Sequence, residues 1–181
     1  MKLHWPEVKI PDGFIDAGSY LRHLVYQGVK EKFVDDDNDS NAENLREERI
    51  GFIEHELEAL KGYEPYLIIS YDLVNFCRAE GIMVSPGYGN AINSIVNYCL
   101  GITTTEPDSF FTFENFFLRG TDLYPKLYIQ VDKTRKDEIL EYLKYTYGEH
   151  HVLRAGVGHR KGHERVPVYA VNQRDRFLIE F

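Results

Sequence analysis

The sequence predicts a single α/β domain, and three observations lead to that fold class. The 181 residues are 43% hydrophobic and 14% aromatic, so the chain is long and apolar enough to bury a sizeable core. Residues 126–132 alternate polar and apolar side chains, which is typical of a half-buried strand, and residues 135–143 follow with the spacing of an amphipathic helix. No internal repeat or low-complexity linker divides the chain.

Helices are predicted through the first half of the chain, after an irregular segment at its start. Apolar stripes at helical spacing indicate two of them, the first capped by Ser19. A third segment is apolar enough for a buried strand, but its length and the closing Gly81 favour a helix. An acidic run between the first two reads as a solvated loop, because the glycine and glutamate of a calcium loop are not in register. The predicted helices cover residues 19–33, 44–61 and 66–81.

The second half is predicted to mix strands and helices. A short strand leads through a tight loop into a helix that Asn90 caps and Gly101 closes. The aromatic run at residues 109–117 fits a short core helix better than a base-stacking surface. The strands are predicted at residues 82–84, 151–157, 166–171 and 176–181, with a basic loop at residues 158–165.

The loop "SPGYG" and the helix start after it have the strongest chemistry in the chain. Gly87 and Gly89 allow backbone amides to point inward, and a helix beginning at Asn90 adds partial positive charge. Together these suit a phosphate group, although the pattern matches neither the P-loop nor the dinucleotide fingerprint. A turn that merely starts a buried helix fits the same residues, so both interpretations stay open.

The segment "MVSPGYGNAINSIVNYCLGITTTEP" resembles part of the bacterial replicative DNA polymerases of the polymerase III alpha-subunit (C) family. The similarity continues in "PYLIISYDLVNFCRAEGI" and "TRKDEILEYLKYTYG", in the same order and with similar spacing. It implies a polymerase-beta-like nucleotidyltransferase palm, a mixed sheet with helices packed on it, over residues 19–155. Residues 1–18 would be an irregular N-terminal segment, and residues 156–181 a divergent part of the same domain. The candidate phosphate- or nucleotide-binding residues are then Gly87, Tyr88, Gly89, Asn90 and Ser94.

The family's catalytic strand carries three aspartates that hold two magnesium ions, and this chain lacks all three. The resemblance places those positions on Lys126, Tyr128 and Gln130. Two-metal catalysis needs anionic oxygens to hold and neutralise magnesium, which a lysine, a neutral phenol and an amide do not supply. We therefore expect no catalytic residue, no metal site and no cofactor, with magnesium relevant only if some activity survives.

The predicted function is that of a catalytically inactive, palm-like relative of polymerase III alpha. It would act in DNA replication or repair as an accessory module that weakly binds a nucleotide, DNA or a replication or repair protein. One alternative is an active DNA-directed nucleotidyltransferase that recruits metal through Asp132, Asp122 or Glu114. The other is a structural interaction protein with a relic active site. We also expect the chain to lack the fingers, thumb, clamp-binding segment and N-terminal phosphatase-like domain of a complete polymerase.

The charge balance argues against a dedicated nucleic-acid-binding protein. The net charge is −8 and the isoelectric point is about 5.4, whereas such proteins carry a basic footprint. Arg160, Lys161 and Arg165 in the basic loop are possible nucleic-acid contacts, with weak and salt-sensitive binding. A histidine metal site there is less favoured, because glycines interrupt the spacing between His159 and His163.

Two further features bear on the compartment. Cys77 and Cys99 lie in apolar helical segments, which predicts two reduced core thiols rather than a disulfide. The N-terminal residues contain no apolar run long enough for a signal peptide or membrane span. A cytoplasmic protein without a membrane partner is therefore expected.

Overall fold

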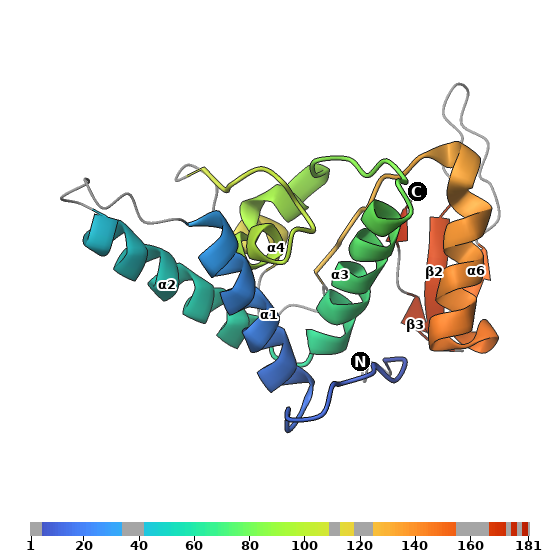
Figure 1. The fold of residues 1–181 in the computed structure, drawn as a ribbon, viewed down its shortest axis with the longest axis horizontal. Coiled ribbons are helices and arrows are strands. Elements are labelled where there is room, and N and C mark those ends of the chain that lie inside the picture. Colours follow the sequence, from blue (N-terminus) through green and yellow to red (C-terminus); the bar gives the residue numbers. More distant parts are fainter. Residues whose placement is uncertain are drawn as a thin grey trace.

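Helices dominate the computed structural model, which describes residues 5–33, 42–108, 113–117, 125–154, 167–172, 175–176 and 179–180. Figure 1 shows α3 near the middle, with α1, α2 and α4 on one side of it and α6 on the other. In the described ranges, no helix combines the length and the apolar character that crossing a bilayer requires. The helices are α1 (Ala17–Lys32), α2 (Ala42–Ala59), α3 (Glu64–Ala79), α4 (Ile95–Cys99), α5 (Phe113–Phe116) and α6 (Lys136–Tyr147), with 3₁₀ turns η1 (Gly89–Asn93), η2 (Lys133–Arg135) and η3 (Glu149–His151).

The start of α1 corrects one predicted cap. Asp16, not Ser19, is the N-cap residue, and its carboxylate accepts a hydrogen bond of 2.7 Å from the Ser19 amide. The Ser19 hydroxyl accepts in return from the Asp16 amide, which completes a capping box. The bond from Ser19 also lowers the pKa of Asp16. Ser19 supports the helix end from inside its first turn.

The predicted α/β fold with a mixed sheet is wrong. Most of the described chain is helical, and the strands that form a sheet are short, antiparallel and confined to the C-terminal part. The strand predicted at residues 126–132 does not form, since residues 125–130 belong to no strand and Val131 makes one isolated bridge to Val84. The sheet strands are β1 (Val152–Arg154), β2 (Pro167–Asn172), β3 (Asp175–Arg176) and β4 (Ile179–Glu180), with β2 paired to each of the others.

The extended segment 125–131 packs between helices, and its backbone bonds explain why no sheet forms around it. Its Leu127 amide donates to the Tyr66 hydroxyl of α3 at 2.9 Å, where a sheet would supply a strand carbonyl. Near its end, the Ser85 amide donates to Gln130 O at 2.8 Å and the Asp132 amide donates to Met83 O at 3.0 Å. The backbone of this segment is thus satisfied by a short pairing with residues 83–85 and by the Tyr66 hydroxyl, instead of by neighbouring strands.

The apolar side chains that alternate along this segment are buried in two helical cores rather than on one face of a sheet. Leu127 is fully buried in a core built mainly by α1, α2, α4, α5 and the first half of α3. Ile129 lies in a second core, between the end of α3 and α6. Cys99 lies in the first core and Cys77 in the second, both as free thiols, as predicted. Burial raises the pKa of Cys77 to about 11 and that of Cys99 to about 12.

A part-buried polar contact joins α3 to α6. Asp72 accepts hydrogen bonds from the hydroxyls of Tyr142 at 2.6 Å and Tyr147 at 2.8 Å. The Tyr142 ring also stacks on Phe76, with 3.8 Å between ring centroids. Burial and then the Asp72 carboxylate raise the pKa of Tyr147, so the phenol stays a hydrogen-bond donor. The pair of phenols on one carboxylate fixes the rotation of α6 against α3.

Replacing Asp72 with alanine is expected to loosen this helix pair. Two part-buried hydroxyls would lose their acceptor, which costs about 1–3 kcal/mol in unfolding free energy. Urea-induced unfolding followed by circular dichroism measures the change. Glu141→Ala on the exposed side of α6 is the control and should change stability by less than about 0.5 kcal/mol. Equal effects of the two substitutions would contradict the assignment.

Candidate functional site

The glycine loop predicted to bind phosphate lies against the extended segment. Gly87 and Gly89 have φ angles of 147° and 61°, which favour glycine. A Cβ at Gly87 would lie 2.7 Å from Ile92 Cγ2, so the loop has no room for a side chain there. The Thr104 amide donates to Pro86 O at 2.7 Å and holds the start of the loop. The loop conformation therefore depends on both glycines.

The helix after the loop starts later than predicted. Residues Gly89–Asn93 form the 3₁₀ turn η1, and α4 begins only at Ile95. Its N-cap is Ser94, whose hydroxyl accepts from the Asn97 amide at 3.1 Å, and the predicted Asn90 cap is wrong. Asn90 cannot cap an α-helix here, because it lies inside the 3₁₀ turn η1, which is wound more tightly than an α-helix.

A carboxylate from α2 occupies the N-terminus of α4. Glu56 is 4% exposed and accepts from the amides of Ile95 and Val96, each at 3.0 Å. The Ser94 hydroxyl donates to it at 2.6 Å. Burial raises the pKa of Glu56 to about 7, although these three donors act in the opposite direction. The protein thus supplies its own hydrogen-bond acceptor at this helix end.

Glu56 changes the composition of the predicted phosphate site. Ser94 is fully buried and faces Glu56, so it lies beneath the loop rather than on its outer side. The groups left to meet a ligand are the amides of residues 87–90 and the side chains opposite them. Sequence reasoning missed Glu56, yet its spacing from Ile53 and Leu60 placed it on the buried stripe of α2. A carboxylate on such a stripe signals a buried partner.

The polar face of the extended segment borders the loop. Lys126 and Gln130 are exposed and Tyr128 is half-buried, while the residues between them are buried. The rings of Tyr88 and Tyr128 meet edge to face, with centroids 6.0 Å apart and planes at 90°. A Cβ at Gly89 would lie 3.8 Å from the Tyr128 ring. The structure therefore brings Tyr128 and Gln130, two of the three positions where the family's aspartates were expected, beside the loop.

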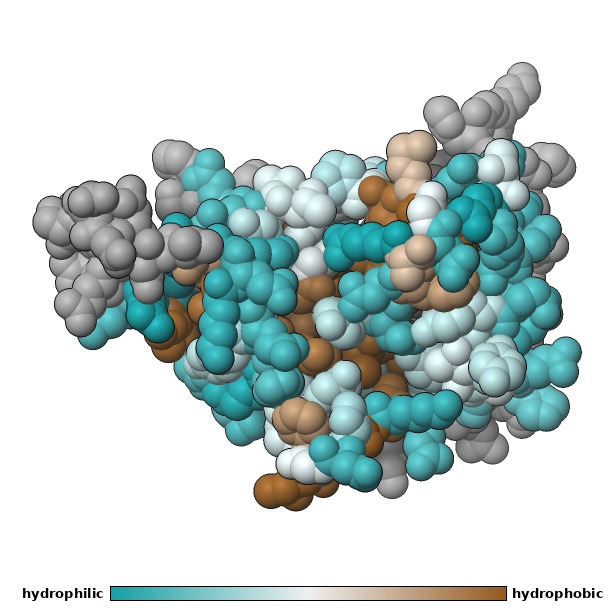
Figure 2. Space-filling model, viewed as in Figure 1, coloured by the Kyte–Doolittle hydropathy of each residue, from teal (hydrophilic) through white to brown (hydrophobic). Residues whose placement is uncertain are grey.

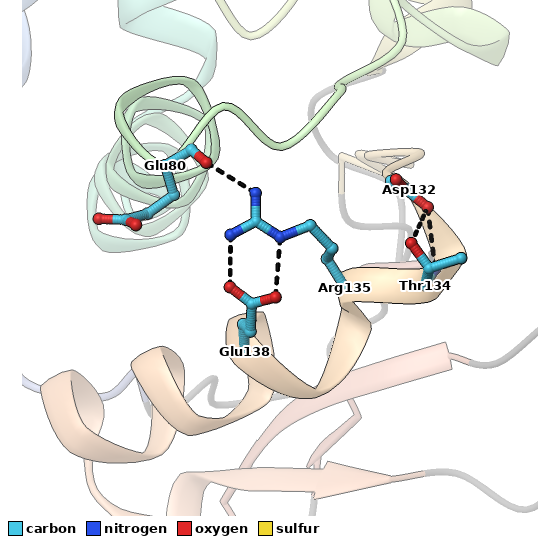
Figure 3. Close-up of polar contacts among 5 residues, drawn as sticks. All are labelled: Glu80, Asp132, Thr134, Arg135 and Glu138. Atoms are coloured by element: carbon cyan, nitrogen blue, oxygen red, sulfur yellow. Dashed lines mark hydrogen bonds and ion pairs between the residues drawn. The ribbon is translucent and has the colours of Figure 1, made fainter.

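The nearest carboxylate on this segment, Asp132, is already engaged. It accepts from the Thr134 amide at 2.9 Å and from the Thr134 hydroxyl at 2.8 Å, as the N-cap of η2 (Figure 3). The hydrogen bond from the Thr134 amide lowers the pKa of Asp132. Arg135 points the other way, to the Glu138 carboxylate and to Glu80 O at the end of α3 (Figure 3). These contacts make Asp132 part of the turn into α6.

One of the remaining predicted site residues lies on α5, which packs against η1, and the others lie outside the described chain. Glu114 is exposed on α5. Among the described residues, no three His, Cys, Asp or Glu side chains gather closely enough to hold a metal ion. Of the aromatic run, Phe113, Phe116 and Phe117 are buried as predicted. The residues that lie outside the described ranges are Asp122, Arg160, Lys161 and Arg165.

Comparison with known proteins supplies the family. The sequence profile described as "Bacterial DNA polymerase III alpha NTPase domain" matches residues 19–166. The chain belongs to this family. It is 33% identical over 153 residues to the "Error-prone DNA polymerase" of Methylococcus capsulatus, which covers 83% of this chain and 14% of that polymerase. It is also 36% identical over 103 residues to the "DNA polymerase III subunit alpha" of Staphylococcus epidermidis, covering 55% of this chain and 10% of that subunit.

Membership in the polymerase III alpha family confirms the resemblance seen in the sequence. The matched region contains both the glycine loop and the extended segment. The chain spans about one seventh of the length of the error-prone polymerase it matches. Lys126, Tyr128 and Gln130 thus belong to a polymerase III alpha family region and carry no carboxylate.

Proposed function

We propose that this chain acts in bacterial DNA replication or repair as a catalytically inactive member of the polymerase III alpha family that binds nucleotides weakly. The observation that carries the proposal is the outward face of the extended segment. Where two-metal catalysis needs carboxylates, this face presents Lys126, Tyr128 and Gln130 beside the glycine loop. Asp132, the nearest carboxylate in the segment, serves as a cap.

The same groups support nucleotide binding. Backbone amides at Gly87–Asn90 suit phosphate oxygens, and Lys126, on the same face as Tyr128, adds a positive charge. The partly exposed rings of Tyr88 and Tyr128 offer aromatic surface to a base. Because Glu56 fills the end of α4, only the loop amides and Lys126 face the phosphates. Binding is therefore expected in the millimolar range, sensitive to salt and independent of magnesium.

Titration with dATP, followed by NMR amide shifts, tests the binding. Shifts at residues 87–90 should be the same with and without magnesium. Gly89→Val should abolish them, because a β-branched residue does not tolerate a φ of 61°. Gly89→Asn is the matched control, since asparagine accepts this backbone conformation. Unmoved loop amides at millimolar dATP would refute nucleotide binding.

A primer-extension assay with magnesium or manganese tests the inactivity. No nucleotide should be incorporated by the wild-type protein, because the described residues contain no cluster of carboxylates that could hold a metal ion. Metal-dependent extension that is lost in Asp132→Asn would overturn the proposal. That result would establish the alternative, a nucleotidyltransferase with a relocated carboxylate.

A further inference from the structure

A pocket lies at the opposite end of α4 from the glycine loop. It has a volume of 450 Å³, within the range of sites for small organic ligands, and opens between α1, α3 and the residues after α4. Figure 2 shows apolar residues between the hydrophilic surfaces of α1 and α3 on this face. The floor residues include Leu24, Gly28 and Leu100.

Two cations converge on this pocket. Lys32, from the last turn of α1, donates to Tyr98 O and lies 4.1 Å from the centre of the Tyr98 ring. Arg78, from the last turn of α3, donates to Gly101 O. Gly101 allows this approach, because a Cβ there would lie 2.9 Å from Arg78 Nη1. Both of these bonds go to uncharged carbonyl groups.

The positive charge of the pocket contrasts with the chain around it. Burial lowers the pKa of Lys32, and the charge of nearby Arg78 lowers it further. Cys99 and, more weakly, the exposed Glu31 act in the opposite direction and raise the pKa of Lys32. The whole chain has a net charge of −8, yet this half-enclosed pocket places two cations close together. An anion between them would relieve their mutual repulsion.

We propose that this pocket binds a small organic phosphate monoester. Its phosphate would lie between Lys32 and Arg78, which combine a mobile ammonium with a planar guanidinium suited to phosphate oxygens. Its apolar part would rest on Leu24 and Leu100, and amide groups of Gln27 and Asn75 line the same pocket. The site is independent of the proposed nucleotide site, because it shares no residue with the glycine loop.

Binding of phenyl phosphate, inorganic phosphate and benzoate distinguishes the contribution of the phosphate group from that of the apolar part. Phenyl phosphate should bind at least about tenfold more tightly than either of the others, since it alone combines the phosphate with an apolar body. Amide shifts should appear at Gln27, Asn75 and Gly101. Lys32→Gln and Arg78→Gln should each weaken binding about tenfold or more, as expected for loss of a charge-assisted hydrogen bond.

Matched variants guard against indirect effects. Lys30→Gln removes an exposed charge from the same helix outside the pocket and should leave the affinity unchanged. Arg78→Lys keeps the positive charge, so this variant should bind phenyl phosphate more tightly than Arg78→Gln does. Both variants alter the contact with Gly101, so the comparison separates the charge from any loosening of the fold. Equal weakening by Lys30→Gln, shifts confined to residues 87–90, or no shift at millimolar phenyl phosphate would each overturn the proposal. The first and third of these results leave dATP binding at the loop untouched, and the second would place the phosphate at the loop instead.

Discussion

Replacing Gly28 with alanine is expected to destabilise the protein by roughly 3 kcal/mol, the upper end of the usual cost of overpacking. Gly28 is buried where α1 crosses α4, and an added Cβ would lie 1.9 Å from the Cys99 carbonyl oxygen. That atom belongs to the backbone, so no side-chain rotation relieves the clash. The two helices would have to separate, which would open the core around Leu24 and Val96.

Gly51→Ala on α2 is the matched control for Gly28→Ala. Gly51 also lies inside a helix, but nothing lies within 4 Å of an added Cβ. Alanine favours the helix over glycine, so this variant should gain about 0.5–1 kcal/mol. Urea-induced unfolding of both variants measures the two changes. Changes of the same sign would show that helix propensity, rather than the contact with Cys99, decides the effect at Gly28.

The helices could be predicted from the sequence because each depends on a local apolar stripe. Leu21, Leu24 and Val25 recur at helical spacing, and the structure buries all three on one side of α1. The ends were harder to predict. Asp16 and Ser19 both suit a cap, and only the backbone conformation at Asp16 decides between them.

The sheet could not be predicted, because alternation indicates which side chains are buried and not what pairs with the backbone. Leu127 and Ile129 are buried, as the pattern of the extended segment indicates. Their burial comes from two helical cores, and the Leu127 amide bonds to Tyr66, 61 positions away. Such a distant side-chain acceptor leaves no local signal in the sequence.

The sequence predicted the loop of the candidate site but not the contact of Glu56 with the start of α4. Two glycines within three residues indicated the turn at Gly87 and Gly89, and both have positive φ angles. The contact between Glu56 and Ser94 spans 38 positions, so it depends on how α2 packs against α4. That contact decides what the helix end can bind, and it followed from tertiary structure alone.

Glu56→Ala is expected to destabilise the protein by about 2–4 kcal/mol at pH 5, because three buried donors would lose their acceptor. Ser94 and Val96 are fully buried and Ile95 is 7% exposed, so water has little access to replace the carboxyl group. Glu58→Ala, two residues along α2, is the control. Glu58 is exposed in an ion pair with Lys61, so its loss should cost less than about 1 kcal/mol.

The cost of Glu56→Ala should shrink as the pH rises. The folded pKa of Glu56 is about 7, above the ordinary value of 4.5, so the folded state holds this proton more tightly than the unfolded state. The resulting stabilisation is complete below pH 4.5 and is lost as the pH rises through 7. The wild type should therefore lose up to about 3 kcal/mol relative to the variant across this window, at 1.36 kcal/mol per pKa unit. Unfolding curves of both proteins from pH 4.5 to 8 measure the difference and cancel the other titrating groups. A difference that stays constant, or grows with pH, would show that the three hydrogen bonds outweigh burial and keep Glu56 ionised.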